Sequence, residues 1–201
     1  GHEINIGKHI KFDPGRLNKV WIKNCVAIGL SANFVEPLEA TSIGTSIQQA
    51  FLLSHNLSNP VSSVREQYNN QIKSEMENIR DFIYLHYFSW HKHNWFWKNY
   101  SYFNAPISLK KMLNLWSKRL PINDDIKTSD YSLFWAPNFI QVLDGLNYYG
   151  FNTYVEKQYK FLPKKIKDEL EDYLDNNLKK KYSNSIFKTH KEIIKTINEA
   201  N

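Results

Sequence analysis

Two carboxylates just ahead of a helix start are the residues of this chain best suited to do chemistry. Glu36 and Glu39 flank the dipeptide Pro37-Leu38, and a helical pattern begins at Thr41. Proline restricts the backbone, so both carboxylates are expected to be held in place. The exposed amides of a helix start bind anions, and a fixed carboxylate beside them suits proton transfer. Helix capping, a common role for acids at this position, is the simpler alternative.

Short strands before this loop and helices after it are the elements that would position it. Residues 9–12 and 20–22 suit short strands, and residues 25–30 form a small-apolar run typical of a strand buried on both faces. Cys25 is accordingly expected to be buried and inert. Apolar spacings of three and four predict a long helix over residues 61–87. Further helices are predicted to begin at Thr41, near Ser108, after Pro137 and at Pro163. The expected fold class is α+β, mostly helical.

Composition limits the function classes. The 201 residues carry a net charge of +6 and 15% aromatic residues, with a single cysteine, which excludes an internal disulfide. Mean hydropathy is −0.55 and no apolar run is long enough for a membrane span, so neither a membrane nor a secretion signal is expected, and the location is predicted to be cytoplasmic. Half of the charge excess lies in a lysine-rich tail typical of a solvated helix, so nucleic acid is not an expected partner.

The histidines and aromatic residues leave alternatives open. His86, His91 and His93 cluster around tryptophans, but no third metal ligand follows at a convincing spacing, so no metal site is predicted. The many rings suit either a well-filled core or a pocket for a planar molecule. Composition does not separate these two interpretations.

At this point the sequence resembles a known family. The run NCVAIGL at residues 24–30, followed by EPLEAT at residues 36–41, is similar to the signature of the flavin-dependent tryptophan halogenases. Further matching positions are Gly15-Arg16, Trp21, Phe82-Ile83, His86-Tyr87, Phe96-Trp97, Phe134-Trp135 and Gly145-Leu146. The resemblance covers most of residues 9–150.

The resemblance implies an activity and its partners. Family members use reduced FAD, supplied by a separate flavin reductase, and O2 to oxidise chloride or bromide to hypohalous acid. That species reaches a catalytic lysine and halogenates tryptophan or another indole or aromatic substrate. The resemblance also leaves room for a homodimer of the full-length enzyme.

Site residues follow from the same resemblance. Glu39 takes the place of the catalytic glutamate beside the substrate, and the amides of Thr41 and Ser42 take the place of the halide site. Leu30 and Ile43 take the place of flavin contacts. The residues that correspond to the tryptophan pocket are Asp130, Phe134 and Trp135.

Several positions depart from the family pattern. No Gly-x-Gly-x-x-Gly fingerprint follows a strand, and the catalytic lysine that comes after it in the family is absent too. Ala40 and Ser42 stand where serine and glycine are expected, and Asn123-Asp124 lie near the place of two adjacent tyrosines. We therefore expect the C-terminal portion of a halogenase, inactive alone. Residues 1–58 would end a flavin-binding domain and residues 59–201 would form a helical substrate-binding module. The alternative is a non-enzymatic, aromatic-rich helical module that binds a small planar ligand.

Overall fold

The computed structural model describes residues 11, 13–88, 95–126, 132–148 and 151–179. The chain divides into two compact units, residues 1–152 and residues 153–201. The boundary does not fall at residue 58, because helices on either side of that position pack against each other. The assignment of residues 1–58 to a flavin-binding domain stays a prediction.

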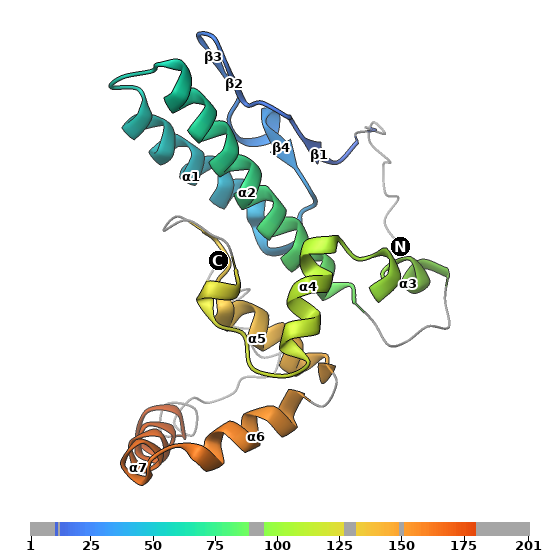
Figure 1. Ribbon diagram of the computed structural model, residues 1–201, viewed down its shortest axis with the longest axis vertical. Coiled ribbons are helices and arrows are strands. Elements are labelled where there is room, and N and C mark those ends of the chain that lie inside the picture. The colour runs from blue at the N-terminus through green and yellow to red at the C-terminus, as the bar shows by residue number, and fades with distance from the viewer. Residues whose placement is uncertain (1–10, 12, 89–94, 127–131, 149–150, 180–201) are drawn as a thin grey trace, which may run out of the picture. The chain divides into compact units, whose positions relative to one another are not determined.

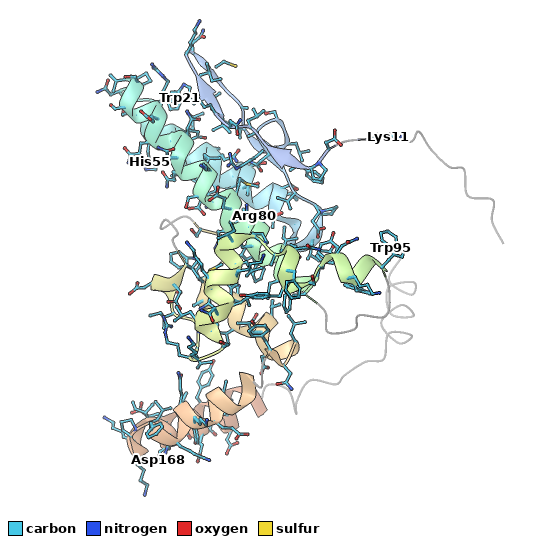
Figure 2. All side chains as sticks on the ribbon, turned by 45° about the vertical axis from the view of Figure 1, so that its right-hand side comes forward. Lys11, Trp21, His55, Arg80, Trp95 and Asp168 are labelled. Carbon is cyan, nitrogen blue, oxygen red and sulfur yellow. The ribbon has the colours of Figure 1, made fainter. Side chains whose placement is uncertain are left out.

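Within the described residues of the first unit, four very short strands form two separate antiparallel pairs. Strand β1 (Gly15–Arg16) pairs with β4 (Asn33–Phe34), and β2 (Trp21–Ile22) pairs with β3 (Cys25–Val26). Trp21, labelled in Figure 2, is buried and its ring meets the edge of the Tyr68 ring at 5.4 Å. The strands therefore rest on the helices that follow them.

The small-apolar run at residues 25–30 is not a buried strand, and this expectation was wrong. Only Cys25 and Val26 of this run form a strand, in the β2–β3 hairpin, and Cys25 is exposed. The run then turns at Gly29 into the 3-10 helix η1 (Gly29–Ser31). Gly29 has a φ of +62°, its amide donates to Gln49 Oε1 at 2.7 Å, and an added Cβ would lie 2.5 Å from Ser46 Oγ. Close docking on the next helix therefore interrupts the strand.

Helices α1 and α2 form the frame of the first unit. They run antiparallel side by side, with the strands along the same pair (Figure 1). Helix α1 spans Thr41–Asn56 and α2 spans Ser62–His86, which confirms both predicted helices. Later in this unit, the described residues also form α3 (Trp95–Asn99), η3 (Tyr102–Asn104), α4 (Ile107–Trp116), η4 (Asn123–Asp125) and α5 (Ala136–Gly145).

The core of the first unit is rich in aromatic rings. Fully buried side chains of α4 and α5 meet there, with the Trp116 and Phe139 rings 5.2 Å apart. Phe82 of α2 lies 5.0 Å from Phe139 and 3.9 Å from Phe134, on which it stacks. Much of the aromatic content therefore fills a core, as the first of the two interpretations predicts.

The described part of the second unit is helical. Helix α6 (Phe151–Phe161) crosses the boundary between the units, and α7 (Lys164–Tyr173) and the π-helical turn η6 (Leu174–Lys179) follow it. The Tyr159 hydroxyl donates to Glu171 Oε1 at 2.7 Å, which ties α6 to α7. Helix α7 begins directly after Pro163, as predicted. No described helix has both the length and the apolar composition that crossing a membrane requires.

Candidate functional site

The loop between the two carboxylates is strained at Glu39. After Pro37 the chain enters the 3-10 turn η2 (Leu38–Ala40), in which Glu39 has φ 61° and Ala40 has φ 49°. Left-handed backbone at a residue other than glycine costs about 1–3 kcal/mol and is concentrated at functional sites. Two such residues in succession therefore indicate that the backbone of this loop is held in its conformation at a cost in stability.

Two consecutive residues at the end of α2 hold the two carboxylates. His86 Nε2 lies 3.5 Å from Glu39 Oε1, and the Tyr87 hydroxyl donates to Glu36 Oε1 at 2.8 Å. The hydrogen bond to Glu36, together with burial, raises the pKa of the Tyr87 hydroxyl to about 12. The 36–39 loop is therefore clamped to α2 at both ends, although 47% of the Glu39 side chain stays exposed.

The orientation of His86 determines what the Glu39 contact can do. His86 Nδ1 lies 2.9 Å from the Phe82 carbonyl oxygen, which can only accept, so Nδ1 is the protonated nitrogen. Nε2, the other ring nitrogen, then faces the Glu39 carboxylate. A histidine ring held beside a carboxylate is an arrangement that acid–base sites use.

Of the residues that the family resemblance assigns to halide and flavin, Thr41, Ser42 and Ile43 lie in the first turn of α1, and Leu30 lies in η1. Thr41 is buried and Ser42 is partly buried, while Leu30 and Ile43 are 68% and 65% exposed. Ala40 occupies the N-cap without a side-chain cap for the first helical turn. Ser42 lies within the helix, and the left-handed conformation falls at Glu39 and Ala40 instead. The halide and flavin roles stay predictions.

Of the residues assigned to the substrate pocket, Phe134 is buried and Asp130 lies outside the described residues. Phe134 is only 7% exposed and stacks on Phe82, which in turn meets the His86 ring at 4.6 Å. The order of contacts is therefore Glu39, His86, Phe82, Phe134. Trp135 is partly buried and donates through Nε1 to the Ser132 carbonyl at 2.9 Å. The structure thus connects Glu39 and Phe134 through successive side-chain contacts, and Phe134 is part of the hydrophobic core.

Two contacts fasten the segment before Phe134 to α1 and α2. The Ser132 hydroxyl lies 2.9 Å from one oxygen and 3.1 Å from the other oxygen of the buried Glu75 side chain. A Cβ added to Gly44 would lie 3.0 Å from Leu133 Cδ1, so Leu133 rests directly on the first turns of α1. Sequence reasoning missed Glu75, because a single acid within an amphipathic helix has no pattern that marks it as buried.

A pocket that sequence reasoning did not predict lies on the Glu36 side of the loop. Its volume is about 410 Å³. Two arginines and two tyrosines line it, among other residues, and Glu36 contributes to it while Glu39, Thr41 and Ser42 do not. Arg80, labelled in Figure 2, donates to Ser108 Oγ at 2.9 Å and pairs with the buried Asp81. Arg80 and Tyr84 are four residues apart on α2, a spacing that places them on the same face of the helix. This spacing did not indicate a pocket, because charged residues on a helix face are also typical of a face exposed to solvent.

A metal centre finds no support within the described part of the chain. No group of three or more histidine, cysteine, aspartate or glutamate side chains there could hold an ion. His86 is engaged by Phe82 and Glu39, while His91 and His93 lie outside the described residues.

Comparison with known proteins identifies relatives of most of the first unit. The family model described as tryptophan halogenase matches residues 2–156. A tryptophan 6-halogenase from Streptomyces toxytricini is 31% identical over 128 residues, which are 59% of this chain and 23% of that protein. A tryptophan 7-halogenase from Lentzea aerocolonigenes is 31% identical over 153 residues, covering 68% of this chain and 28% of that protein.

Solved structures agree with these sequence relatives. A flavin-dependent halogenase from Brevundimonas sp. BAL3 superposes with a TM-score of 0.62 at 33% identity, covering 70% of this chain and 28% of that chain. A tryptophan halogenase from Shewanella frigidimarina gives a TM-score of 0.64 at 32% identity, covering 69% and 27%. The chain therefore spans only about a quarter of the length of these relatives.

Proposed function

This chain belongs to the tryptophan halogenase family, and from that premise we propose that it supplies the acid–base glutamate and part of the substrate-binding module of a flavin-dependent halogenase. The substrate would be tryptophan or a related indole, and chloride or bromide would be the halide. The observation that carries the proposal is Glu39, held in a left-handed backbone conformation beside His86. Backbone strain at a carboxylate that lies beside a histidine side chain is typical of a catalytic loop, whereas helix capping needs neither feature.

Flavin would meet this chain at one edge. When bound, reduced FAD with O2 supplies the oxidising power that turns a halide ion into an electrophile. The exposed apolar side chains of Leu30 and Ile43 suit contact with a flat ring, whereas the nucleotide has no glycine-rich cradle in these residues. The fit therefore extends to the ring alone, and the flavin reductase would act on the part of the enzyme that holds the nucleotide.

The residues of this chain would act on the substrate through Glu39. Substitution on an indole ring forms a cation that must lose one ring proton. Glu39 Oε1 would accept this proton, and His86 Nε2 would orient the carboxylate and relay the proton onward. The uncapped amides at Thr41 and Ser42 would hold the halide, since a helix start attracts anions.

The test joins the full 201-residue chain to the flavin-binding part of the Shewanella frigidimarina relative. The fusion receives a flavin reductase, FAD, bromide and tryptophan or indole, and mass spectrometry detects the brominated product by its isotope doublet. We expect Glu39→Gln to lower product formation about 10²–10⁴-fold. The matched control, Glu36→Gln, removes the neighbouring carboxylate and should cost less than tenfold. An active fusion that Glu39→Gln does not impair would remove Glu39 from the mechanism.

Non-enzymatic binding of a planar ligand is the second candidate. The pocket of about 410 Å³, with Tyr84 and Tyr100 in its wall, favours it, because tyrosine rings suit flat molecules. Titration of the 201-residue chain alone with indole or tryptophan tests this function. Saturable binding that Tyr84→Ala abolishes and Glu39→Gln leaves intact, with no turnover in the fusion, would favour the binding module.

A further inference from the structure

Helix α7 carries its charges in an order that does not stabilise the helix itself. Its lysines come first and its acids follow. These residues are, in chain order, Lys164, Lys165, Lys167, Asp168, Glu169, Glu171 and Asp172. The partial positive charge at a helix start and the partial negative charge at its end favour the reverse order. The order of charges in α7 therefore calls for an explanation outside the helix.

One side of α7 exposes a line of apolar side chains. Ile166, Leu170 and Tyr173 are 39%, 42% and 55% exposed, and Leu174 continues the line in η6. Spacings of three and four residues place these side chains on one face of the helix. We call these four residues the α7 stripe. Exposed apolar side chains that lie next to one another mark an interaction surface.

Helix α6 lies along one flank of the α7 stripe and leaves the stripe itself exposed. The Tyr159 hydroxyl donates to Glu171 Oε1 at 2.7 Å, and Lys167 Nζ lies 5.4 Å from the centre of the Tyr159 ring. Lys167 also donates to the Lys160 carbonyl oxygen at 3.0 Å. Lys167 and Glu171 are one turn apart and share this flank of α7. A partner of α7 would therefore approach over the stripe and its other flank.

The other flank of the α7 stripe complements itself in charge when two copies run antiparallel. It carries Lys165, Glu169 and Asp172, all exposed, and within the helix Lys165 Nζ lies 4.0 Å from Glu169 Oε1. A twofold axis midway between Ile166 and Leu170 places each flank against the same flank of the other copy. Lys165 of one copy then lies within about 3 Å, along the helix axis, of the level of Glu169 and Asp172 of the other. The antiparallel arrangement pairs opposite charges, whereas a parallel one would bring like charges together.

The surface lies outside the region that the halogenase family accounts for. The family match ends at residue 156, and α7 begins at Lys164. The α7 stripe offers roughly 350 Å² of apolar surface, less than the ~800 Å² per partner that stable complexes bury. Association through this surface is therefore expected to be weak and to depend on protein concentration.

We propose that the α7 stripe is a self-association surface, on which two copies of this chain pack antiparallel with Lys165 of each facing Glu169 and Asp172 of the other. A uniformly acidic or uniformly basic partner would match only one half of α7 and repel the other half. A second copy matches both halves at once. The proposal is independent of the proposed function, because α7 contributes no residue to the Glu39 site.

Sedimentation velocity of the 201-residue chain tests the proposal between about 1 and 300 μM, a range suited to weak interfaces. We expect a monomer at the low end and a dimer that becomes more populated as the concentration rises. Lys165→Glu places like charges on the flank and should raise the dissociation constant of the dimer about tenfold or more. The matched control Lys164→Glu makes the same change of charge on the side of α7 away from the stripe, and should alter that constant less than about twofold.

A complementary pair of variants tests which charges face each other. Glu169→Lys combined with Asp172→Lys should weaken self-association as Lys165→Glu does. An equimolar mixture of this double variant with Lys165→Glu restores opposite charges at both contacts and should recover the dimer. All three positions are exposed, so the thermal unfolding midpoints should stay close to that of the native chain.

Three results would overturn the proposal. The first is a native chain that stays monomeric over the whole concentration range. The second is a dimer that Lys165→Glu weakens no more than Lys164→Glu does, since the contact would then lie elsewhere on the chain. The third is a mixture of the complementary variants that does not recover the dimer.

Discussion

The proposed chemistry of Glu39 should be most sensitive to substitution of its neighbour His86. Its Nδ1 is anchored to the Phe82 carbonyl and its Nε2 faces Glu39. We expect His86→Ala to lower kcat in the fusion about 10–100-fold with little change in KM for the indole, because His86 touches the carboxylate rather than the substrate. His86→Gln keeps a polar amide group near the Nε2 position and should recover part of the rate.

Steady-state kinetics of both variants, with thermal unfolding as the control, checks this expectation. If His86→Ala and His86→Gln are equally impaired and equally destabilised, His86 serves only to pack against Phe82.

Tyr87 makes a pH-dependent contribution to stability. Its hydrogen bond to Glu36 and its burial raise the pKa of the hydroxyl from about 10 to about 12. Because the folded chain favours the protonated tyrosine, this contribution is complete below pH 10 and is lost as the pH rises toward 12. We expect Glu36→Gln to return the pKa of Tyr87 toward 10. NMR titration of ¹³C-labelled tyrosine, assigned with Tyr87→Phe, measures it, and a Tyr87 pKa unchanged by Glu36→Gln would contradict the assignment.

At the level of elements, alanine-to-glycine substitution is expected to change stability in opposite directions in the turn η2 and in helix α1. Ala40 has a left-handed backbone, so Ala40→Gly removes strain and should raise the free energy of unfolding by about 0.5–1 kcal/mol. Ala50 is exposed in the middle of α1, where Ala50→Gly should lower it by about 1 kcal/mol. Urea unfolding of the two variants checks the signs. Destabilisation by both would show that Ala40 is not left-handed.

At the level of the whole molecule, the division into two compact units predicts that the second unit is dispensable for the stability of the first unit. Among the residues whose burial the structure describes, the buried hydrophobic core runs from Val20 to Tyr148. A chain ending at residue 152 should therefore unfold cooperatively, with a thermal midpoint within about 3 °C of the 201-residue chain. Differential scanning calorimetry measures both midpoints. A drop of ten degrees or more would show that residues 153–201 complete the core.

The sequence by itself predicted helices α1, α2, α4, α5 and α7, because apolar spacing and proline punctuation are local signals. Helices α3 and α6 were not predicted. Helix α2 was predicted within a residue at each end, and the start of α7 after Pro163 was correct. The family signature at residues 24–41 identified the loop, and Glu36 and Glu39 within it, from side-chain types alone. These features depend on neighbours along the chain, so no knowledge of the packing was needed.

Only the tertiary structure decided what surrounds the glutamates and which way α1 faces. His86 and Tyr87 reach the loop from about fifty residues away, and Phe134 is buried in the core. The run at residues 25–30 looked like a buried strand, yet docking of Gly29 on α1 bends it away. Periodicity reveals that a helix has an apolar side, but which side is buried depends on the partners that the rest of the protein provides.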